Sequence, residues 1–412
     1  MDLRLPGALA LLRRSPRFAR FWGATFASQV GDAMAWIALP WFVLQATGSA
    51  TAAAGVLAAL QLPAIVSGAL MGSLLDRFQP RTIMLVDNGL RSALFVAIPA
   101  VYAIGGLELW LLYLLVVAAG ALEPATHVGT RVMIPELVDD AELESANMLL
   151  ALGDSLSVVA GPVAAGVLVA GVGGPFVLVL DAASFAAMAV VAALLPPIVR
   201  AGPRRRPSLA ERFGVRQIWR SKVLRVATLL SLVFFFSYGP LEAALPVFSE
   251  RVLSTDARGF GLLWTALGLG MMAGTLLSSW LGRRVRVGVA LPSIAVAWGV
   301  CLAPLTLMTE VAPAAAVLAL GGFVWGPYVP LETTFLQRVV PRDQLGRVFG
   351  FRSTLLMSAA PLGIAGGGAL LAILPSTVLI GLSAAACVAV GLLGLASRTL
   401  RRAAVPPSVP GV

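Results

Sequence analysis

The sequence contains little charge. Only 12% of its 412 residues are Asp, Glu, Lys or Arg, whereas 58% are hydrophobic. A soluble domain usually carries about 25% charged residues, so this chain lacks the polar surface that a water-soluble fold needs. Apolar runs of roughly 20 residues, enough to cross the hydrocarbon core of a bilayer, recur along the whole length. The scarcity of charge therefore predicts a multi-pass membrane protein.

Residues that build metal, redox and nucleotide sites are also scarce. There are one histidine, His127, and two cysteines, Cys301 and Cys387, so we expect no metal site and no disulfide. A P-loop needs a lysine directly after Gly-x-x-x-x-Gly, and the single lysine, Lys222, follows Trp-Arg-Ser. Polar stretches are too short for a soluble catalytic domain. We therefore expect no catalytic residues, no cofactor and no ATP site.

Twelve apolar runs divide into two sets of six. The first set covers 18–46, 51–75, 82–105, 108–130, 146–171 and 174–195. The second covers 224–249, 259–282, 287–309, 311–336, 347–373 and 375–397. Each run is long enough for a transmembrane helix. The predicted fold is an all-α membrane protein with about 12 transmembrane helices.

The positive charge lies almost entirely on one side of these predicted spans. The formal net charge is +10, and 26 of the 30 basic residues fall in the termini, the central loop and alternate short loops. Only Arg251 and Arg258 fall on the other side. Because Lys and Arg accumulate in cytoplasmic loops, both termini should be cytoplasmic, in a plasma (inner) membrane. This distribution argues against nucleic acid as a partner.

The two halves resemble each other at an offset of 206 residues. Gly68 then aligns with Gly274, and Arg77 aligns with Arg283. Both halves begin and end on the cytoplasmic side, so the repeat is parallel. The predicted domains are a bundle of six helices at 1–195, a cytoplasmic linker at 196–222 and a second bundle of six at 223–412. This organisation resembles the major facilitator superfamily, in which the substrate site lies between the halves.

The loop between spans 2 and 3 resembles the signature of that superfamily, Gly-x-x-x-Asp-Arg-x-x-x-Arg. It contains Gly72, Asp76, Arg77 and Arg81 at the same spacing. The resemblance implies a cytoplasmic latch, in which Asp76 meets the positive N-terminus of span 11. The alternative is a solvated turn whose arginines only set the topology.

Span 5 contains Gly161, Pro162 and Gly166, which resemble part of a motif of drug-exporting antiporters. The alternative is ordinary packing of small residues between membrane helices. Two further stretches, Gly31-Asp32 in span 1 and the segment 131–147 before span 5, resemble one branch of the superfamily. That branch contains macrolide efflux proteins and the enterobactin exporter.

Acidic residues inside the spans are the candidate functional groups. They are Asp32, Asp87, Glu123, Asp154, Asp181, Glu242 and Glu332. A charge in hydrocarbon costs at least about 2.5–3.5 kcal/mol, so such residues usually face a cavity or a partner. The resemblance places four of them, Asp32, Glu123, Glu242 and Glu332, on helices that line the central cavity. Asp154 and Asp181 lie nearer span ends and are interpreted as structural.

Asp32 is the first candidate for proton coupling and Glu123 the second. Asp32 lies near mid-membrane, where loss of hydration favours the neutral form of a carboxyl group. Glu123 precedes His127 by one helical turn and could relay a proton to it, although His127 could equally serve packing. Trp36, one turn after Asp32, is a candidate cavity residue, although it could instead belong to an aromatic belt at the membrane interface. Asp87 and Arg91 have the i,i+4 spacing of an ion pair on one helix face.

The residues together predict a secondary active transporter, functional as a monomer and driven by a proton gradient. We expect it to export a small amphipathic compound, such as a drug, siderophore or metabolite, by alternating access. An uptake carrier or facilitator of the same fold is the main alternative. An intramembrane enzyme and a sensor that transports nothing are more distant alternatives.

Overall fold

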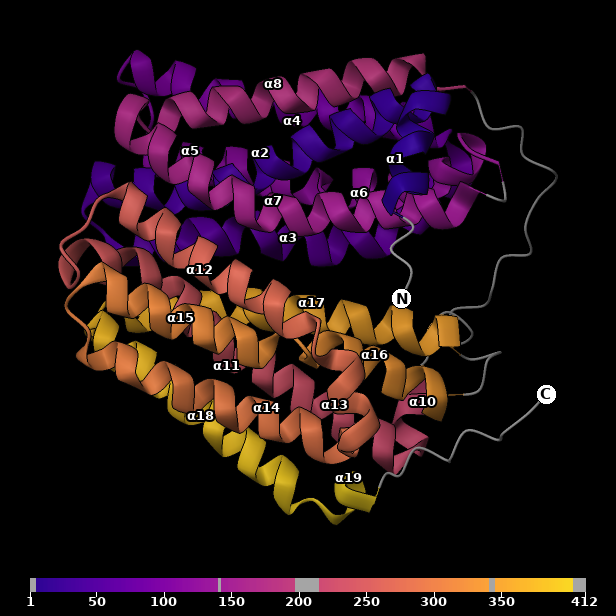
Figure 1. Cartoon of the computed structure of the whole chain (residues 1–412). Coiled ribbons are helices and arrows are strands. Elements are labelled where there is room, and N and C mark those ends of the chain that lie inside the picture. The colour runs from indigo at the N-terminus through magenta and orange to yellow at the C-terminus, as the bar shows by residue number, and fades with distance from the viewer. Residues whose placement is uncertain (1–4, 140–141, 197–214, 341–344, 403–412) are drawn as a thin grey trace. The chain divides into compact units, whose positions relative to one another are not determined.

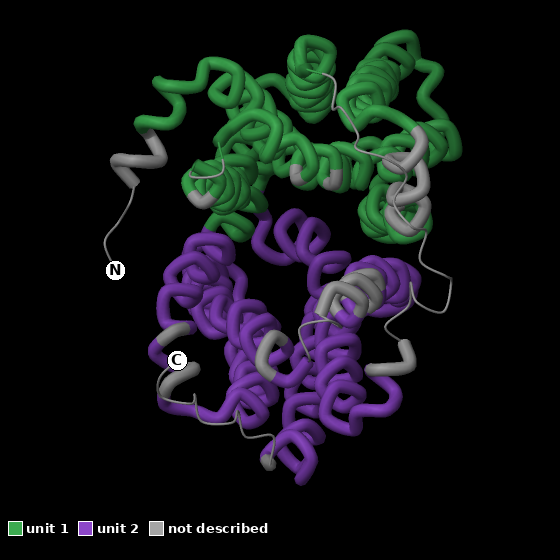
Figure 2. The backbone as a smooth tube through the Cα atoms, turned by 90° about the vertical axis from the view of Figure 1, so that its right-hand side faces the viewer, with its two compact units in different colours: residues 1–202, 256–265 green, residues 203–255, 266–412 purple. Residues whose placement is uncertain are grey.

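The computed structural model describes residues 5–139, 142–196, 215–340 and 345–402, and every regular element in these ranges is a helix. The chain divides into two compact units, coloured separately in Figure 2. Unit 1 comprises residues 1–202 and 256–265, and unit 2 comprises residues 203–255 and 266–412. The break at 202 falls inside the predicted linker 196–222, whose last part forms a short helix, α10 (Val215–Arg220).

In the described part of its first half, the chain forms eight α-helices and one 3-10 turn. They are α1 (Leu5–Arg14), α2 (Pro16–Thr47), α3 (Ala50–Arg77), α4 (Pro80–Ala103), α5 (Leu109–Leu122), α6 (Pro124–Met133), η1 (Ile134–Glu136), α7 (Leu143–Val172) and α8 (Gly174–Leu194). Five predicted spans each match one helix, and the fourth is divided between α5 and α6. The division falls at Pro124, because proline has no N–H to donate to the preceding turn.

The second half follows the same plan. After α10 come α11 (Lys222–Arg251), α12 (Ala257–Thr275), α13 (Ser278–Arg284), α14 (Val287–Leu302), η3 (Ala303–Leu307), α15 (Val311–Trp325), α16 (Tyr328–Val339), α17 (Leu345–Leu370), α18 (Ser376–Ala396) and α19 (Arg398–Arg402). The tenth predicted span is divided between α15 and α16, which matches the division of the fourth. Each of the twelve predicted spans is thus recovered as one helix or as two consecutive elements.

Corresponding helices pair in the same way in both halves. In unit 1, α2 packs against α7 and α8, and α4 packs along α8 (Figure 1). In unit 2, α11 packs against α17 and α18, and α14 packs along α18. The first helix of each half therefore contacts its fifth and sixth helices, and the third contacts the sixth. This shared pattern is the structural counterpart of the predicted repeat of two sets of six helices.

The outer surface of these helices is apolar. Val66, Trp110, Leu114, Val167 and Leu194 are each more than half exposed. Within the described ranges, nine helices are long and apolar enough to cross a membrane. Their backbone N–H and C=O groups bond within the helix, which hydrocarbon requires. The chain is therefore a multi-pass membrane protein.

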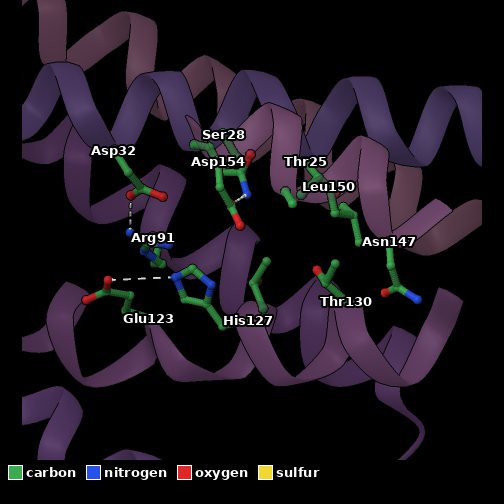
Figure 3. Close-up of a pocket in the computed structure, with 13 residues that line it drawn as sticks. Thr25, Ser28, Asp32, Arg91, Glu123, His127, Thr130, Asn147, Leu150 and Asp154 are labelled. Atoms are coloured by element: carbon green, nitrogen blue, oxygen red, sulfur yellow. Dashed lines mark hydrogen bonds and ion pairs between the residues drawn. The ribbon is translucent and has the colours of Figure 1, made fainter. Parts of the chain in front are cut away.

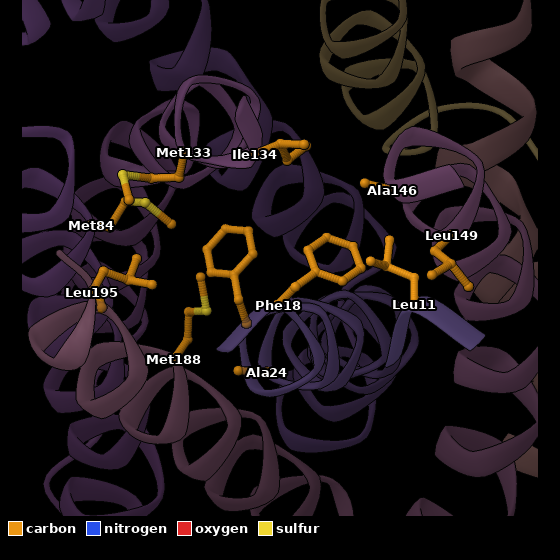
Figure 4. Packing of buried hydrophobic residues seen from close by; sticks show 12 residues of the cluster. Leu11, Phe18, Ala24, Met84, Met133, Ile134, Ala146, Leu149, Met188 and Leu195 are labelled. Atoms are coloured by element: carbon orange, nitrogen blue, oxygen red, sulfur yellow. The ribbon is translucent and has the colours of Figure 1, made fainter. Parts of the chain in front are cut away.

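An apolar cluster holds one end of unit 1 together (Figure 4). Leu11 of α1 and Phe18 of α2 meet Met84 of α4, Met133 of α6 and Met188 of α8, all almost fully buried. The flexible methionine side chains fill the irregular space where several helix ends converge. This cluster fixes the ends of α2, α4 and α6, which carry the polar residues described next.

Candidate functional site: a polar pocket in unit 1

A cavity of about 200 Å³ lies between α2, α4, α6 and α7 of unit 1. Most of the residues that line it are polar or charged, in contrast to the apolar residues of the outer surface. The lining residues are Thr25, Ser28, Gln29, Asp32, Arg91, Glu123, Thr126, His127, Thr130, Asn147, Leu150, Ala151 and Asp154. Figure 3 shows Asp32, Arg91, Glu123 and His127 together at one end, and Thr130 and Asn147 at the other.

Four polar residues of α2 form one side of this pocket. Thr25, Ser28, Gln29 and Asp32 follow one another at helical spacing, so they lie on one face of the helix. Gln29 bonds across the pocket to the carboxylate of Asp154 on α7. Our sequence interpretation selected only Asp32, although the polar periodicity of 25, 28, 29 and 32 is the signal that identifies the whole face.

Asp32 forms an ion pair with Arg91 of α4. The Oδ1 atom of Asp32 lies 2.5 Å from Nη2 of Arg91. The Asp32 side chain is 34% exposed, whereas that of Arg91 is 4% exposed. The sequence predicted Asp87 as the ion-pair partner of Arg91, and this prediction is wrong, because the partner is Asp32. Asp87 is buried and instead accepts a hydrogen bond from Thr126 of α6.

Glu123 occupies the junction of α5 and α6. The chain breaks at Pro124, so Glu123 stands at the start of the shorter helix that carries Thr126, His127 and Thr130. Its Oε1 atom lies 3.9 Å from Nε2 of His127, which is an ion-pair distance when the histidine is protonated. The His127 side chain is 62% exposed, so it contacts the open part of the pocket. The proton relay between these residues stays a prediction.

The other predicted cavity residues do not line this pocket. Trp36 is half-buried, and its ring meets that of Trp264 edge to face at 6.5 Å between centroids. Glu242 of α11 is buried. Glu332 of α16 is also buried, paired with Arg352 of α17 and hydrogen-bonded by Ser231 of α11. Glu332 therefore lies inside unit 2 as part of an ion pair, which its position in the sequence does not indicate.

Of the predicted latch, only Arg81 has a described side chain. Gly72, Asp76 and Arg77 fall in the stretch 68–77, whose side chains lie outside the described part of the chain. The Nη1 atom of Arg81 donates to the carbonyl oxygen of Leu195, at 3.0 Å. Leu195 is the C-cap of α8, where a cation is favoured by the helix dipole. Arg81 thus joins α4 to α8 within unit 1.

The glycines of the exporter-like motif lie where α7 crosses its neighbours most closely. A Cβ atom added at Gly161 would be 2.4 Å from the Cβ atom of Ala33 on α2. One added at Gly166 would be 2.9 Å from the carbonyl oxygen of Ala257. Both glycines are required for close packing, whatever further role the motif has. Pro162 lies inside α7, which continues through it.

Membrane helices in two matching sets, with a charged pocket inside unit 1, are typical of a transporter. The profile of the Major Facilitator Superfamily matches residues 21–364. The chain belongs to this family.

Curated relatives of the chain are named as efflux proteins. It is 28% identical to the multidrug efflux pump Tap of Mycolicibacterium fortuitum over 358 residues, which cover 83% of this chain and 86% of Tap. It is also 28% identical to the enterobactin exporter EntS of Citrobacter koseri, over 98% of this chain and 97% of EntS. Both names agree with the branch that the sequence motifs indicate.

Solved structures show the same fold at low identity. A crystal structure of a variant of the nucleoside transporter NupG superposes with a TM-score of 0.75 at 13% identity, covering 92% of this chain and 99% of NupG. At this identity the likeness supports the fold alone.

Proposed function

We propose that this protein exports a small compound across the plasma membrane in exchange for protons, by alternating access, with Asp32 as the main proton-binding residue. The observation that carries the proposal is the ion pair of Asp32 and Arg91, which stands at the edge of a polar pocket. The names of the efflux relatives support the outward direction.

The pair has the properties of a switch. Its carboxylate is partly exposed to the pocket, while its guanidinium is buried. A proton that reaches Asp32 through the pocket neutralises the carboxylate and leaves the Arg91 charge without its partner. A buried charge without a partner is strongly unfavourable, so protonation should force a rearrangement of α2 against α4. Such a rearrangement gives the coupling between proton binding and conformation that an antiporter requires.

The energy available to such a switch is sufficient. Moving one charge across the membrane releases about 2.3 kcal/mol per 100 mV. A proton that binds from outside and leaves inside also gains about 1.4 kcal/mol per pH unit of gradient. Together these terms are comparable with the couplings of 1–3 kcal/mol typical between sites in proteins.

The lining of the pocket indicates what chemistry the compound carries. Asp32, Glu123 and Asp154 supply three carboxylates against one guanidinium, and the threonines, Ser28, Gln29 and Asn147 supply hydrogen-bonding groups. A cationic compound with several polar groups matches this surface. The sequence predicts an amphipathic compound, and the pocket adds the requirement for a polar, positively charged part.

Resistance profiling of a bacterial host that lacks its own efflux pumps tests the proposal. The wild-type protein should raise the inhibitory concentration of at least one cationic compound in a panel that also includes neutral and anionic ones. Asp32→Asn should abolish this protection at equal expression. Asp256→Asn, which changes an exposed acid outside the spans, is the matched control and should keep it. Protection that persists in Asp32→Asn contradicts the role of Asp32.

A further inference from the structure

Four carboxyl groups surround the single guanidinium of Arg91. Asp32 of α2, Asp87 of α4, Asp181 of α8 and Glu123 at the start of α6 all interact electrostatically with it. Among the described residues, only Asp32 forms an ion pair with Arg91. Four ionised carboxylates beside one cation would leave an excess of negative charge in a low-dielectric interior, which is strongly unfavourable. Some of these groups must therefore hold protons.

Asp181 is the most completely buried member of this group. It is 0% exposed, and its Oδ2 atom has no hydrogen-bond partner among the residues that the structure describes. Its Oδ1 atom accepts one hydrogen bond, from Ser184 at 3.2 Å. The carboxyl group lies directly against α2, because a Cβ atom added at Gly31 would be 2.2 Å from its Oδ1 atom. Gly31 precedes Asp32, and the carboxyl groups of Asp181 and Asp32 interact electrostatically.

Arg91 lies close to Asp181 as well as to Asp32. Its guanidinium is 4.0 Å from the ring centroid of Phe185, which follows Asp181 by one turn of α8. The hydroxyl of Ser92 donates to the carbonyl oxygen of Ala182 at 2.8 Å, which holds α4 and α8 together at this level. The Nε atom of Arg91 is buried and has no hydrogen-bond partner within the described ranges. A donor without an acceptor and an acceptor without a donor therefore lie in one buried cluster.

We propose that Asp181 is a second proton-binding site, and that Arg91 pairs with either Asp32 or Asp181 but not with both. In the arrangement seen here, Arg91 holds Asp32 ionised and Asp181 carries a proton. When Asp32 takes a proton from the pocket, Arg91 turns to Asp181. The Asp181 carboxyl then releases its proton to water in the pocket that Asp32 and Arg91 line, and becomes the ionised partner. One proton is bound and one is released, so the charge of the cluster is unchanged.

Asp87 is the competing partner for a released Arg91, because it lies one turn away on the same helix. Its Oδ2 atom already accepts a hydrogen bond from Thr126, which in turn accepts one from Asn88 at 2.6 Å. Among the described residues, Asp181 accepts a hydrogen bond only from Ser184 of its own helix, so it is not held to another helix as Asp87 is, although Oδ1 of Asp87 and Oδ2 of Asp181 are both buried without a partner. The geometry therefore favours Asp181.

Infrared spectroscopy of the purified protein in lipid nanodiscs tests this inference without any substrate. A neutral carboxyl group has a C=O stretching band that an ionised one lacks. Wild type near neutral pH should show a band that is lost in Asp181→Asn. Ser184→Ala removes the hydrogen bond to Oδ1, together with the bond from the same hydroxyl to the carbonyl oxygen of Asp181, so it should shift the same band. This shift identifies the band even if Asp181→Asn does not fold.

The decisive variant is Asp32→Asn, which leaves the Asp181 carboxyl in place. It frees Arg91 to pair with Asp181, so the Asp181 band should disappear although that residue is unchanged. Asp87→Asn, the matched control on α4, should keep the band. Persistence of the Asp181 band in Asp32→Asn overturns the proposal, as does a wild-type spectrum in which no band depends on Asp181. Loss of the band in Asp87→Asn would also contradict it.

The inference rests on the proposed function for its physiological meaning, and the two can fail separately. Absence of proton-driven transport by wild type would refute the proposed antiport, whatever the spectra show. A persistent band in Asp32→Asn would refute the exchange of partners, even if transport is coupled to protons.

Discussion

The ion pair of Glu332 and Arg352 in unit 2 yields a quantitative prediction. Both side chains are about 5% exposed, and Arg352 also donates to Ser231 at 2.9 Å and to Thr228 at 3.3 Å. Removing one partner of a buried pair typically costs about 3–5 kcal/mol, because the other charge stays buried. In Glu332→Gln, Arg352 keeps the hydroxyl groups of Ser231 and Thr228 as acceptors. We therefore expect the free energy of unfolding to fall by an amount near the lower end of this range, about 3 kcal/mol.

Removing both charges should restore most of this stability. In Glu332→Leu/Arg352→Met, Ser231 still bonds to the carbonyl oxygen of Ala227 and to the hydroxyl of Tyr328, so it is not left without partners. Apolar replacement of a whole buried pair is often neutral or stabilising. We therefore expect the double variant to be closer to wild type than either single change.

Thermal unfolding in detergent measures both effects. The thiol of Cys387 is buried in the folded protein, so a thiol-reactive dye reports its exposure. Glu310→Gln is the matched control, since Glu310 is exposed and makes no side-chain cap bond at the start of α15. If Glu332→Gln unfolds with the wild-type midpoint but loses transport, Glu332 is a cavity residue, and our assignment to the structural interior of unit 2 is wrong.

Three further predictions concern packing, the latch and topology. Gly161→Ala should destabilise the protein by about 1–3 kcal/mol, because its Cβ atom would overlap Ala33. Gly171→Ala on the same helix meets open space and should be tolerated. The midpoints of thermal unfolding of the two variants test this difference. Asp76→Asn should reduce transport without reducing expression, by weakening a helix-terminus contact of about 0.3–2 kcal/mol; unchanged transport would count against the latch. In a cysteine-free background, single cysteines at Ser49 and Gly106 should react with an impermeant thiol reagent added outside. Single cysteines at Ser208 and Ser397 should not react. The reverse pattern would show that the predicted topology is wrong.

The helices could be predicted from the sequence because hydropathy and chain length determine them almost alone. A hydrocarbon environment allows few alternatives to a helix for an apolar run of 20 residues. The division of the fourth span at Pro124 could also be predicted, since proline breaks the hydrogen bonding of the preceding turn. It matters for function because Glu123 stands at that division.

The partners of the charged residues could not be predicted in the same way. Asp87 and Arg91 have the spacing of an ion pair on one helix, yet Arg91 points to Asp32, which is 59 positions away in the sequence. That contact depends on how α2 and α4 pack around α8, and local spacing carries no information about it. Asp181 is interpreted from the sequence as structural because it lies nearer a span end. Only the fold brings it against Gly31 and close to Arg91.

Uptake into proteoliposomes with an acidic lumen tests the central claim most directly, with a compound to which the protein confers resistance as the probe. An acidic lumen drives accumulation through molecules whose cytoplasmic side faces outward. Wild type should accumulate the compound only while the pH gradient lasts, and Asp32→Asn should bind it without accumulating it. Accumulation by wild type that ignores the gradient would contradict proton-coupled export, and gradient-driven accumulation by Asp32→Asn would place the proton site elsewhere.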